Sequence, residues 1–371
     1  MLVYLALSSH GFGHAARQAA VLAALHALHP QWRLVVSCAL NPAVLTVMFH
    51  GLPLEWRTVR WDVGMVQKDA LSCDPAATLA ALEQLDRDLP EPIDQELAWI
   101  QAQGMPVVVL ADIPPSAARL AHRLGAPLVW MGNFGWDDIY ATQGEAFARW
   151  VREAHGAYST GDLVLRMPFH LAMHWGIPER RVGLIASRPR ALPLPLLEHL
   201  NQMEQELVLV GFGGLGMTMA ADCFAQWPHH HFVMSPPTDP SQSQAFDAVD
   251  NLTLLPQGLR PLDVMPHCQR LIGKPGFSTF AEALTIGIGL HVVERDGFAE
   301  AAALIAGVRS HGAHRILSRS QFDQGAWELD RPLLPPREAP LPLDGAHAAA
   351  TVISQLVGSR LGPGVLMNQQ V

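Results

Sequence analysis

The chain has 371 residues, of which 49% are hydrophobic and 16% are charged. This composition excludes an intrinsically disordered protein. The length exceeds one ordinary hydrophobic core and predicts two domains of about 150 to 200 residues each. The formal net charge is −9, and no run rich in Lys or Arg is present. Because phosphate neutralisation needs clustered basic side chains, we expect no nucleic-acid partner.

The cysteines and the N-terminus indicate the compartment. The 4 cysteines lie far apart and form no C-x-x-C pair, so they predict neither a disulfide framework nor a zinc ribbon. Residues 2–7 lack the basic flank and cleavage site of a signal peptide, and we interpret them as a strand. No apolar stretch reaches the roughly 18 residues that span a bilayer. We expect a cytoplasmic protein, with peripheral membrane contact left open.

Short apolar runs alternate with helical patterns along the chain. In the first half, the expected strands cover 2–7, 33–38, 107–112, 128–131 and 163–166. After the proline-rich stretch 188–195, they cover 207–211, 231–234, 252–255, 270–272 and 290–293. This alternation predicts parallel sheets covered by helices on both faces. The restart after the prolines predicts two tandem Rossmann-like, doubly wound α/β domains.

The same pattern predicts the domain boundaries. We expect an N-terminal domain over residues 1–186, a linker over 187–204 and a second domain over 205–343. A helix is expected at 344–357, followed by a flexible tail at 358–371.

A loop with two glycines and two histidines follows the first strand. Residues 8–17 read S-S-H-G-F-G-H-A-A-R, at the edge where open α/β sheets bind their ligands. Glycines admit a substrate close to the backbone, and a histidine moves protons near neutral pH. His10 and His14 are four apart, as in helical metal sites, but we expect a loop without a third ligand and therefore no metal. Arg17 is expected on the surface of the following helix.

A second glycine-rich loop, G-F-G-G-L-G at 211–216, matches the G-x-G-x-x-G pattern after a strand. It is either a phosphate-binding loop or a plain tight turn. A nicotinamide cofactor would also need an acidic residue at the end of the next strand, where the chain has Ser235-Pro236-Pro237 instead.

The segment 273–284, G-K-P-G-F-S-T-F-A-E-A-L, follows a strand and opens a helix, which offers free N–H groups to an anion. Glu282 either forms a capping box with Thr279 or accepts hydrogen bonds from ribose hydroxyls. Lys274 is not a Walker lysine, because Pro275 follows it.

Two further places carry polar groups at strand ends. Asp112 ends an apolar run and is either a helix N-cap or part of a ligand crevice. Downstream, Asn133 and Trp136 lie in a stretch rich in aromatic and acidic residues. Trp136 is either a sugar-stacking platform or an ordinary half-buried tryptophan.

Together these loops resemble the two-domain GT-B glycosyltransferases, including the lipid-intermediate N-acetylglucosaminyltransferase and the UDP-glycosyltransferases. The motifs S-x-H-G-F-G-H-A-x-R, the Asp112-Ile-Pro-Pro stretch, N-F-x-W-D-x-I-Y from Asn133, and G-K-x-G-F-S-T-x-x-E-A-L resemble more closely still the glycosyltransferase-like N-terminal half of plant-type L-arabinokinases. That similarity covers most of residues 3–310.

The resemblance implies a GT-B fold with a cleft between its domains and a metal-independent glycosyl transfer from a nucleotide-diphosphate sugar. The sugar is expected to be UDP-linked, with no cofactor. The catalytic candidates are His14, as the base, and Asp112. The donor-binding candidates are Gly213, Gly214, Gly276, Ser278, Thr279, Glu282 and Arg295. The acceptor-side candidates are Ser9, His10, Gly11, Gly13, Asn133 and Trp136, facing a small-molecule or lipid-linked acceptor.

Other functions stay open at this point. A regulatory protein that binds a nucleotide sugar without turning it over would share the same loops. An epimerase would need paired acid and base groups, which Asp112, Glu294 and Asp296 could supply. The chain has no P-x-x-x-G-x-x-S-S phosphate loop, so sugar kinase activity is not expected.

Overall fold

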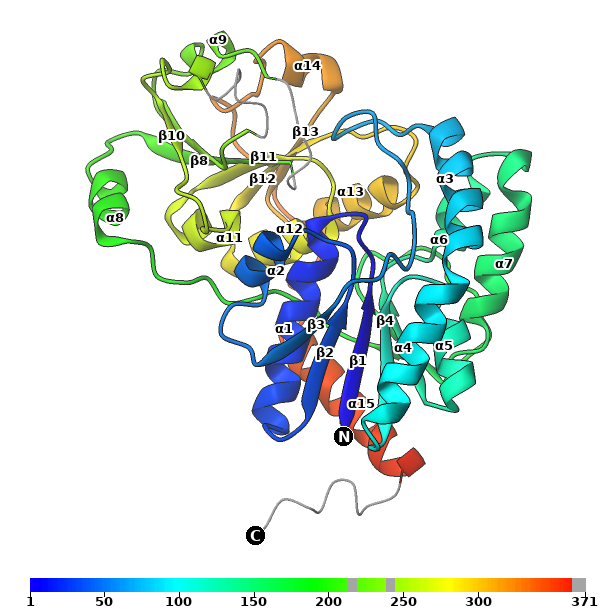
Figure 1. The fold of residues 1–371 in the computed structure, drawn as a ribbon. Coiled ribbons are helices and arrows are strands. Elements are labelled where there is room, and N and C mark those ends of the chain that lie inside the picture. The colour runs from blue at the N-terminus through cyan, green and yellow to red at the C-terminus, as the bar shows by residue number, and fades with distance from the viewer. Residues whose placement is uncertain (213–218, 238–243, 362–371) are drawn as a thin grey trace. The chain divides into compact units, whose positions relative to one another are not determined.

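The computed structural model describes residues 1–212, 219–237 and 244–361. The chain divides into two compact units (Figure 1). Unit 1 comprises Met1–Val66, Asp74–Ile185 and the chain from Pro342 onward, and unit 2 comprises Gln67–Cys73 and Ala186–Leu341. Unit 1 is thus interrupted at Ile185, just before the proline-rich stretch, and resumes at Pro342. The C-terminal helix belongs to unit 1, and the short segment 67–73 belongs to unit 2.

Unit 1 contains a seven-stranded parallel sheet in the order β3-β2-β1-β4-β5-β6-β7. Its strands are β1 (Leu2–Leu7), β2 (Arg33–Ser37), β3 (Leu54–Arg57), β4 (Val107–Asp112), β5 (Leu128–Gly132), β6 (Leu163–Arg166) and β7 (Glu179–Arg181). Every residue of β1 is buried. Strands buried on both faces read as continuous apolar runs, which is why β1 and β4 were predictable.

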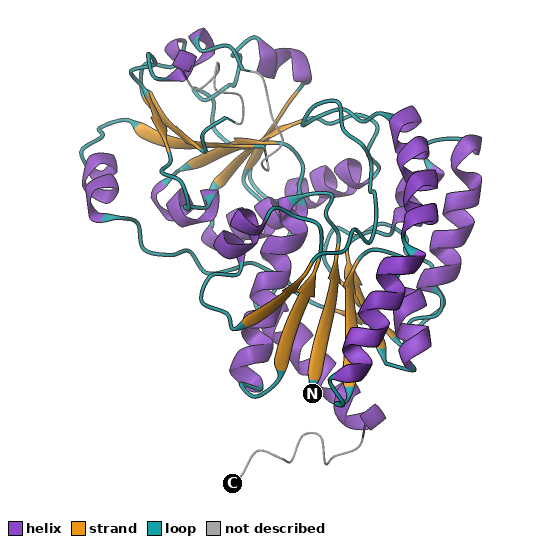
Figure 2. Cartoon of the chain, viewed as in Figure 1, coloured by secondary structure: helices purple, strands orange, loops and turns teal. Residues whose placement is uncertain are grey.

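Helices cover both faces of this sheet (Figure 2). They are α1 (Phe12–Leu28), α2 (Pro42–Met48), α3 (Pro75–Asp88), α4 (Pro90–Ala102), α5 (Ala117–Leu124), α6 (Trp136–Ala141), α7 (Ala148–Tyr158) and α15 (Gly345–Leu361). One hydrophobic cluster joins alternate residues of β1, such as Tyr4, to side chains of α4, α5 and α7. On the other face α1 packs beside α15, where His29 hydrogen bonds to Ser354 at 2.8 Å.

Unit 2 contains a six-stranded parallel sheet in the order β10-β9-β8-β11-β12-β13. Its strands are β8 (Glu206–Gly211), β9 (His230–Met234), β10 (Leu252–Leu254), β11 (Arg270–Gly273), β12 (Gly289–Val293) and β13 (His314–Leu317). Its helices include α8 (Leu194–Asn201), α9 (Asp222–Ala225), α11 (Pro261–Val264), α12 (Phe277–Ile286), α13 (Glu300–His311) and α14 (Arg319–Asp323). Its core joins sheet residues such as Phe232 to Trp327, and to Ala70 and Leu71 of the segment 67–73.

The prediction of two parallel α/β sheets is confirmed. Three strands escaped prediction: β3, β7 and β13, all at sheet edges. An edge strand pairs on one side only and keeps polar residues, and β7 reads Glu-Arg-Arg, with all three residues exposed. The C-terminal helix, expected at 344–357, extends to residue 361.

Candidate functional site

The polar residues of unit 1 gather where the strand order reverses direction. β1 and β4 are neighbours, and from them the chain builds the sheet outward on either side. Open α/β sheets bind ligands at such a switch point, beyond the carboxyl ends of the strands. The loop after β1 and the residue that ends β4, Asp112, meet at this edge.

The first loop is shorter than the sequence predicted. Helix α1 begins at Phe12, with Gly11 in extended backbone as its N-cap, so Gly13 and His14 lie in the first helical turn. Intrinsic helix propensity is a weak determinant, and the buried face of α1 overrides the penalty of Gly13. As a result, His14 and Arg17, three residues apart, lie on the same face of the helix.

His14, Arg17 and Gln18 converge on Asp112, and we call these four residues the Asp112 cluster. His14 Nδ1 lies 2.8 Å from Asp112 Oδ1. Arg17 donates from Nε to Oδ2 at 2.6 Å and from Nη2 to Oδ1, and Gln18 donates from Nε2 to Oδ2 at 2.6 Å. All four side chains are buried. Arg17 is thus not on the surface, as the sequence led us to expect.

Asp112 is ionised in this environment. Burial alone would raise the pKa of its carboxyl, but the charge and hydrogen bonds of Arg17, together with His14, lower the pKa to about 2. A bidentate arginine is the strongest partner that a buried carboxylate finds in a protein. Asp112 therefore acts as a fixed negative charge beside His14, and it is not the N-cap that was the alternative interpretation.

The two acceptor-side candidates beyond β5, Asn133 and Trp136, support this cluster. Asn133 Oδ1 accepts a hydrogen bond from Arg17 Nη1 at 3.1 Å. Trp136 is fully buried and stacks on Tyr140. A ring buried in this way holds the loops in place and does not offer a stacking surface to a sugar. Its Nε1 donates to Asp62 Oδ2 at 2.8 Å.

The remaining acceptor-side candidates line the start of the loop. Ser9 Oγ accepts a hydrogen bond from the N–H of Ala39, which ties the loop to the end of β2. His10 contacts the edge of Trp136, and its Nδ1 accepts from the N–H of Met65 at 3.3 Å. Around Gly11, a Cβ would meet nothing within 4 Å, so its backbone faces open space.

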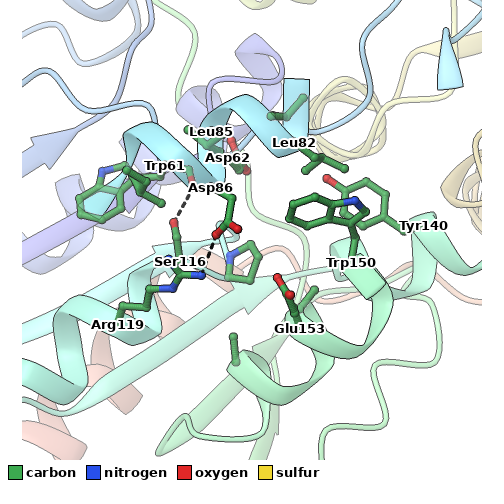
Figure 3. A pocket seen from close by; sticks show the side chains of 15 residues that line it. Trp61, Asp62, Leu82, Leu85, Asp86, Ser116, Arg119, Tyr140, Trp150 and Glu153 are labelled. Carbon is green, nitrogen blue, oxygen red and sulfur yellow. Dashed lines mark hydrogen bonds and ion pairs between the residues drawn. The ribbon is translucent and has the colours of Figure 1, made fainter. Parts of the chain in front are cut away.

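A cavity of about 110 Å³ opens in unit 1 (Figure 3). Trp61 lies on one side, Tyr140 and Trp150 lie on the other, and leucines of α3 complete mostly apolar walls. The polar and charged residues of its lining are Asp62, Asp86, Ser116, Arg119 and Glu153. Through Asp62, which bonds to Trp136, the cavity borders the loops that surround the Asp112 cluster.

The candidate residues of unit 2 lie at the corresponding switch point, between β8 and β11. Gly276 is the N-cap of α12 in extended backbone, and no side chain caps this helix. The positive end of the helix dipole therefore lies at the first turn, which includes Ser278 and Thr279, and this end of a helix favours a bound anion. Beside Gly276, an added Cβ would meet only Thr279 Oγ1, at 4.0 Å. Gly213 and Gly214 lie outside the described residues.

Glu282 faces the interior from α12 and is 9% exposed. Because Gly276 is the N-cap, Glu282 does not form the capping box that was one interpretation. No side chain among the described residues hydrogen bonds to its carboxylate. Burial raises the pKa of Glu282 to about 7, although Arg260 opposes the rise. A carboxylate buried without a donor is costly, which suits a group that awaits hydroxyl donors.

Lys274 and Arg295 follow the neighbouring strands β11 and β12. Burial and then the charge of Arg295 lower the pKa of Lys274 to about 7. Arg295 lies 4.1 Å over the ring of Phe298 and donates from Nη2 to Cys73 Sγ at 3.7 Å. Two cations so close repel each other, and a bound anion would relieve the repulsion. Sequence reasoning missed Lys274, although its place directly after a buried strand was a usable signal.

Neither a metal cluster nor a membrane span is found in the described part of the chain. No group of three or more His, Cys, Asp or Glu side chains there could hold a metal ion. No helix among the described residues is long and apolar enough to cross a membrane.

Comparison with known proteins gives one relative by sequence. The L-arabinokinase of Arabidopsis thaliana is 28% identical over 309 residues, which cover 79% of this chain and 28% of that protein. The chain thus spans little more than a quarter of the length of that relative. No protein-family model matches the chain.

Solved structures show a much wider likeness. A UDP-glucosyltransferase from Polygonum tinctorium that glucosylates indoxyl aligns with a TM-score of 0.61 and 16% identity, over 99% of this chain and 95% of its own. Phytolacca americana UGT2, in complex with UDP-2-fluoro-glucose and pterostilbene, aligns with a TM-score of 0.60 and 13% identity, over 98% of this chain and 92% of its own. Arabidopsis thaliana UGT89C1, in complex with UDP, aligns with a TM-score of 0.62 and 11% identity, over 96% of this chain and 94% of its own. The chain therefore has the two-domain α/β fold of the UDP-glycosyltransferases, the GT-B fold.

Proposed function

We propose that this protein is a metal-independent glycosyltransferase that moves a sugar from a nucleotide-diphosphate sugar, UDP-linked, to a hydroxyl group of a small acceptor. The observation that carries the proposal is the buried pair of His14 and Asp112 at the switch point of unit 1. Solved structures of the same fold include proteins in complex with UDP and with small acceptors, which supports the same chemistry here.

In this proposal His14 is the general base. Its Nδ1 is occupied by the Asp112 cluster, so Nε2 is the nitrogen left for the acceptor. The acceptor oxygen gives its proton to Nε2 as it bonds to the anomeric carbon, and the bond from that carbon to the diphosphate oxygen breaks. The electron pair leaves with the nucleoside diphosphate. General-base catalysis of this kind contributes about 10²–10⁴-fold to a rate.

Unit 2 would bind the donor. The N-terminal end of α12 after Gly276, together with the charges of Lys274 and Arg295, suits a diphosphate and would stabilise the charge that develops on it, without a metal. Glu282 would accept hydrogen bonds from the ribose hydroxyls, which supply the donors that its buried carboxylate lacks.

The cavity of unit 1 would hold the body of the acceptor. Its walls of Trp61, Tyr140 and Trp150 suit an apolar ring, and Asp62 offers an oxygen to a polar substituent. Ala157→Leu, which narrows the cavity, should weaken acceptor binding at least tenfold and leave nucleotide binding intact. Ala141→Leu, an exposed change on α6, is the matched control. The probe is 4-methylumbelliferone, a fluorescent phenol.

Calorimetric titration with UDP, GDP, dTDP and ADP tests the donor site first. The sugar conjugates of the tightest ligand are then incubated with 4-methylumbelliferone and with cell extract, and diphosphate release and product mass are measured. His14→Gln should lower transfer about 10²–10⁴-fold, while the exposed His122→Gln should not. Full activity in His14→Gln contradicts the role of the base. Binding without release points to a regulatory protein, and absence of nucleotide binding contradicts the donor site.

The three carboxylates that an epimerase would use lie in different surroundings. The carboxylate of Asp112 is bonded to Arg17, His14 and Gln18. The other two carboxylates, those of Glu294 and Asp296, are both exposed.

A further inference from the structure

The Asp112 cluster contains one more cation than a pair of base and carboxylate requires. Arg17 engages Asp112 through Nε and Nη2, and its Nη1 donates to Asn133. The same Nη2 lies 2.9 Å from His14 Nδ1. Nδ1 therefore faces a carboxylate oxygen at 2.8 Å and a guanidinium nitrogen at 2.9 Å at once.

These two neighbours make opposite demands on Nδ1. The guanidinium has only hydrogens to offer, whereas the carboxylate has only lone pairs. Donation from Nδ1 to Asp112 leaves Nε2 bare and able to accept a proton from a substrate. If Nδ1 instead accepts a hydrogen bond from Arg17, the hydrogen of the neutral ring lies on Nε2, and Nε2 cannot act as a base. A base at Nε2 thus requires the first arrangement, in which Arg17 donates its hydrogens to Asp112 and Asn133.

The charges in the cluster determine whether the ring is neutral. Asp112 carries −1 and Arg17 carries +1, both within hydrogen-bond reach of the imidazole. With Asp112 alone, the negative charge of the carboxylate would favour the protonated form of the buried imidazole, which cannot act as a base. With Arg17 in place, the charge of Asp112 is already balanced, and a proton on His14 would give the buried cluster a net charge of +1.

Beyond the Asp112 cluster, the groups to consider near the ring of His14 are Asp62, His10 and Phe134. Asp62, on the loop after β3, is close enough for the charge of His14 to lower its pKa, although burial raises that pKa overall. His10 contacts the ring of Trp136, which in turn donates a hydrogen bond to Asp62. The edge of Phe134 contacts His14 at 6.1 Å between ring centres and carries no charge. Gln18 adds a hydrogen bond to Asp112 and no charge.

We infer that Arg17 is a positioning residue that takes over the charge of Asp112, so that His14 stays neutral and keeps Nε2 available as a base. This inference rests on the proposed function for its catalytic meaning, but the protonation of His14 can be measured without any substrate. It assigns Arg17 a role that depends on its charge, in addition to its packing.

The experiment follows the imidazole of His14 by nuclear magnetic resonance of 15N-histidine-labelled protein, with its signal identified by its loss in His14→Gln. In Arg17→Met, the ring should take up its proton at a pH about one to two units higher than in the wild type. In Asp112→Asn it should do so at a lower pH. The double variant should lie between the two, because both charges are removed.

Two further variants separate charge from packing. Arg17→Lys keeps the charge and should titrate close to the wild type, even where the lost fork geometry lowers activity. Gln18→Met removes a donor to Asp112 without changing charge and should move the titration far less than Arg17→Met. Where transfer activity is present, the acid limb of its pH profile should move with the resonance.

The outcomes distinguish this inference from the proposed function. An unchanged His14 titration in Arg17→Met overturns the role of Arg17, whatever the activity. If Arg17→Met does not fold, the comparison is made between Asp112→Asn and the double variant, and removal of Arg17 must again raise the titration. A shifted titration in a protein without transfer activity supports the role of Arg17 and contradicts the proposed function alone.

Discussion

Trp136 donates a hydrogen bond from Nε1 to Oδ2 of Asp62 at 2.8 Å, and both side chains are buried. The bond fastens the loop after β3 to helix α6. A second bond, from the hydroxyl of Tyr140 to the carbonyl of Gly64 at 3.1 Å, fastens the same loop two residues later. This loop forms part of the wall of the cavity, so its position determines the shape of the cavity.

Trp136→Phe should destabilise the protein by about 1–3 kcal/mol, because it leaves a buried carboxylate oxygen without its donor. Urea denaturation at pH 7 measures the difference, and Trp56→Phe, a change at an exposed tryptophan of β3, is the control. Burial raises the pKa of Asp62, so the difference should shrink as the pH falls through that raised value and the carboxyl becomes neutral. A loss no larger than in the control would show that the bond does not hold the loop.

Glu282→Gln should make the protein more stable at pH 8. The pKa of Glu282 is about 7 in the folded protein, against an ordinary value of 4.5, so folded-state protonation stabilises the protein at low pH. That stabilisation is fully present below pH 4.5 and is lost as the pH rises to 7. Gln does not titrate, so the variant should gain nothing near pH 4.5 and about 3 kcal/mol at pH 8.

The same substitution should weaken nucleotide binding, because an amide offers only one acceptor oxygen to the ribose hydroxyls. Denaturation at the two pH values and calorimetry with UDP measure both effects, with the exposed Glu294→Gln as control. Equal stability of variant and wild type at pH 8 would contradict the burial of a charged Glu282. Unchanged UDP affinity would remove Glu282 from the donor site.

Lys274 should make nucleotide binding dependent on pH. Its pKa of about 7 means that the free protein holds this lysine largely neutral at pH 8, whereas a bound diphosphate favours the charged form. UDP binding at pH 8 should therefore take up close to one proton, and the affinity of the wild type should fall as the pH rises from 7 to 9. Lys274→Met should bind more weakly and without proton uptake.

Calorimetry in two buffers of different ionisation enthalpy measures this uptake. Lys68→Met removes the same charge from an exposed position of unit 2 and is the matched control. Proton uptake that persists in Lys274→Met would assign it to another group.

Two glycines of unit 1 should respond oppositely to alanine. At Gly156, within α7, an added Cβ meets nothing within 4 Å, so Gly156→Ala should stabilise the protein by up to about 1 kcal/mol through helix propensity. At Gly345, the start of α15, an added Cβ would overlap the carbonyl oxygen of Gly183. Gly345→Ala should therefore destabilise it by about 1–3 kcal/mol, since overpacking displaces the backbone. Thermal unfolding of both variants checks the signs, and equal signs would contradict the close approach.

The fold was predictable from the sequence where a strand is buried on both faces of its sheet. Strands covered on both faces, such as β1 and β4, are apolar throughout and stand out in the sequence. Edge strands such as β7 are stabilised by pairing on one side and carry residues of loop-like composition. The segment 67–73 was not predictable as part of unit 2, because its two apolar residues, Ala70 and Leu71, form no periodic pattern.

The sequence predicted which residues belong to the candidate site, but not which of them contact one another. His14 and Asp112 are 98 residues apart, and only the pairing of β1 with β4 brings them together. Arg17 was expected on the surface, because a lone arginine on a helix is usually solvated. Its burial follows from a carboxylate contributed by another strand, which no local pattern encodes. No local pattern predicts the low pKa of Lys274 either, because Arg295, whose charge lowers that pKa, follows the neighbouring strand.

The order of segments along the chain has a consequence for synthesis. Helix α15, which packs on α1, is made after the whole of 186–341, whereas α1 is made before that segment. Domains fold largely as units while the chain is still growing. Unit 2 already has its segment 67–73 when its last strand appears, so it can complete its core first. Until α15 is made, the face of α1 that it covers has no partner from this helix, so unit 1 completes its packing only after the chain of unit 2 has been synthesised.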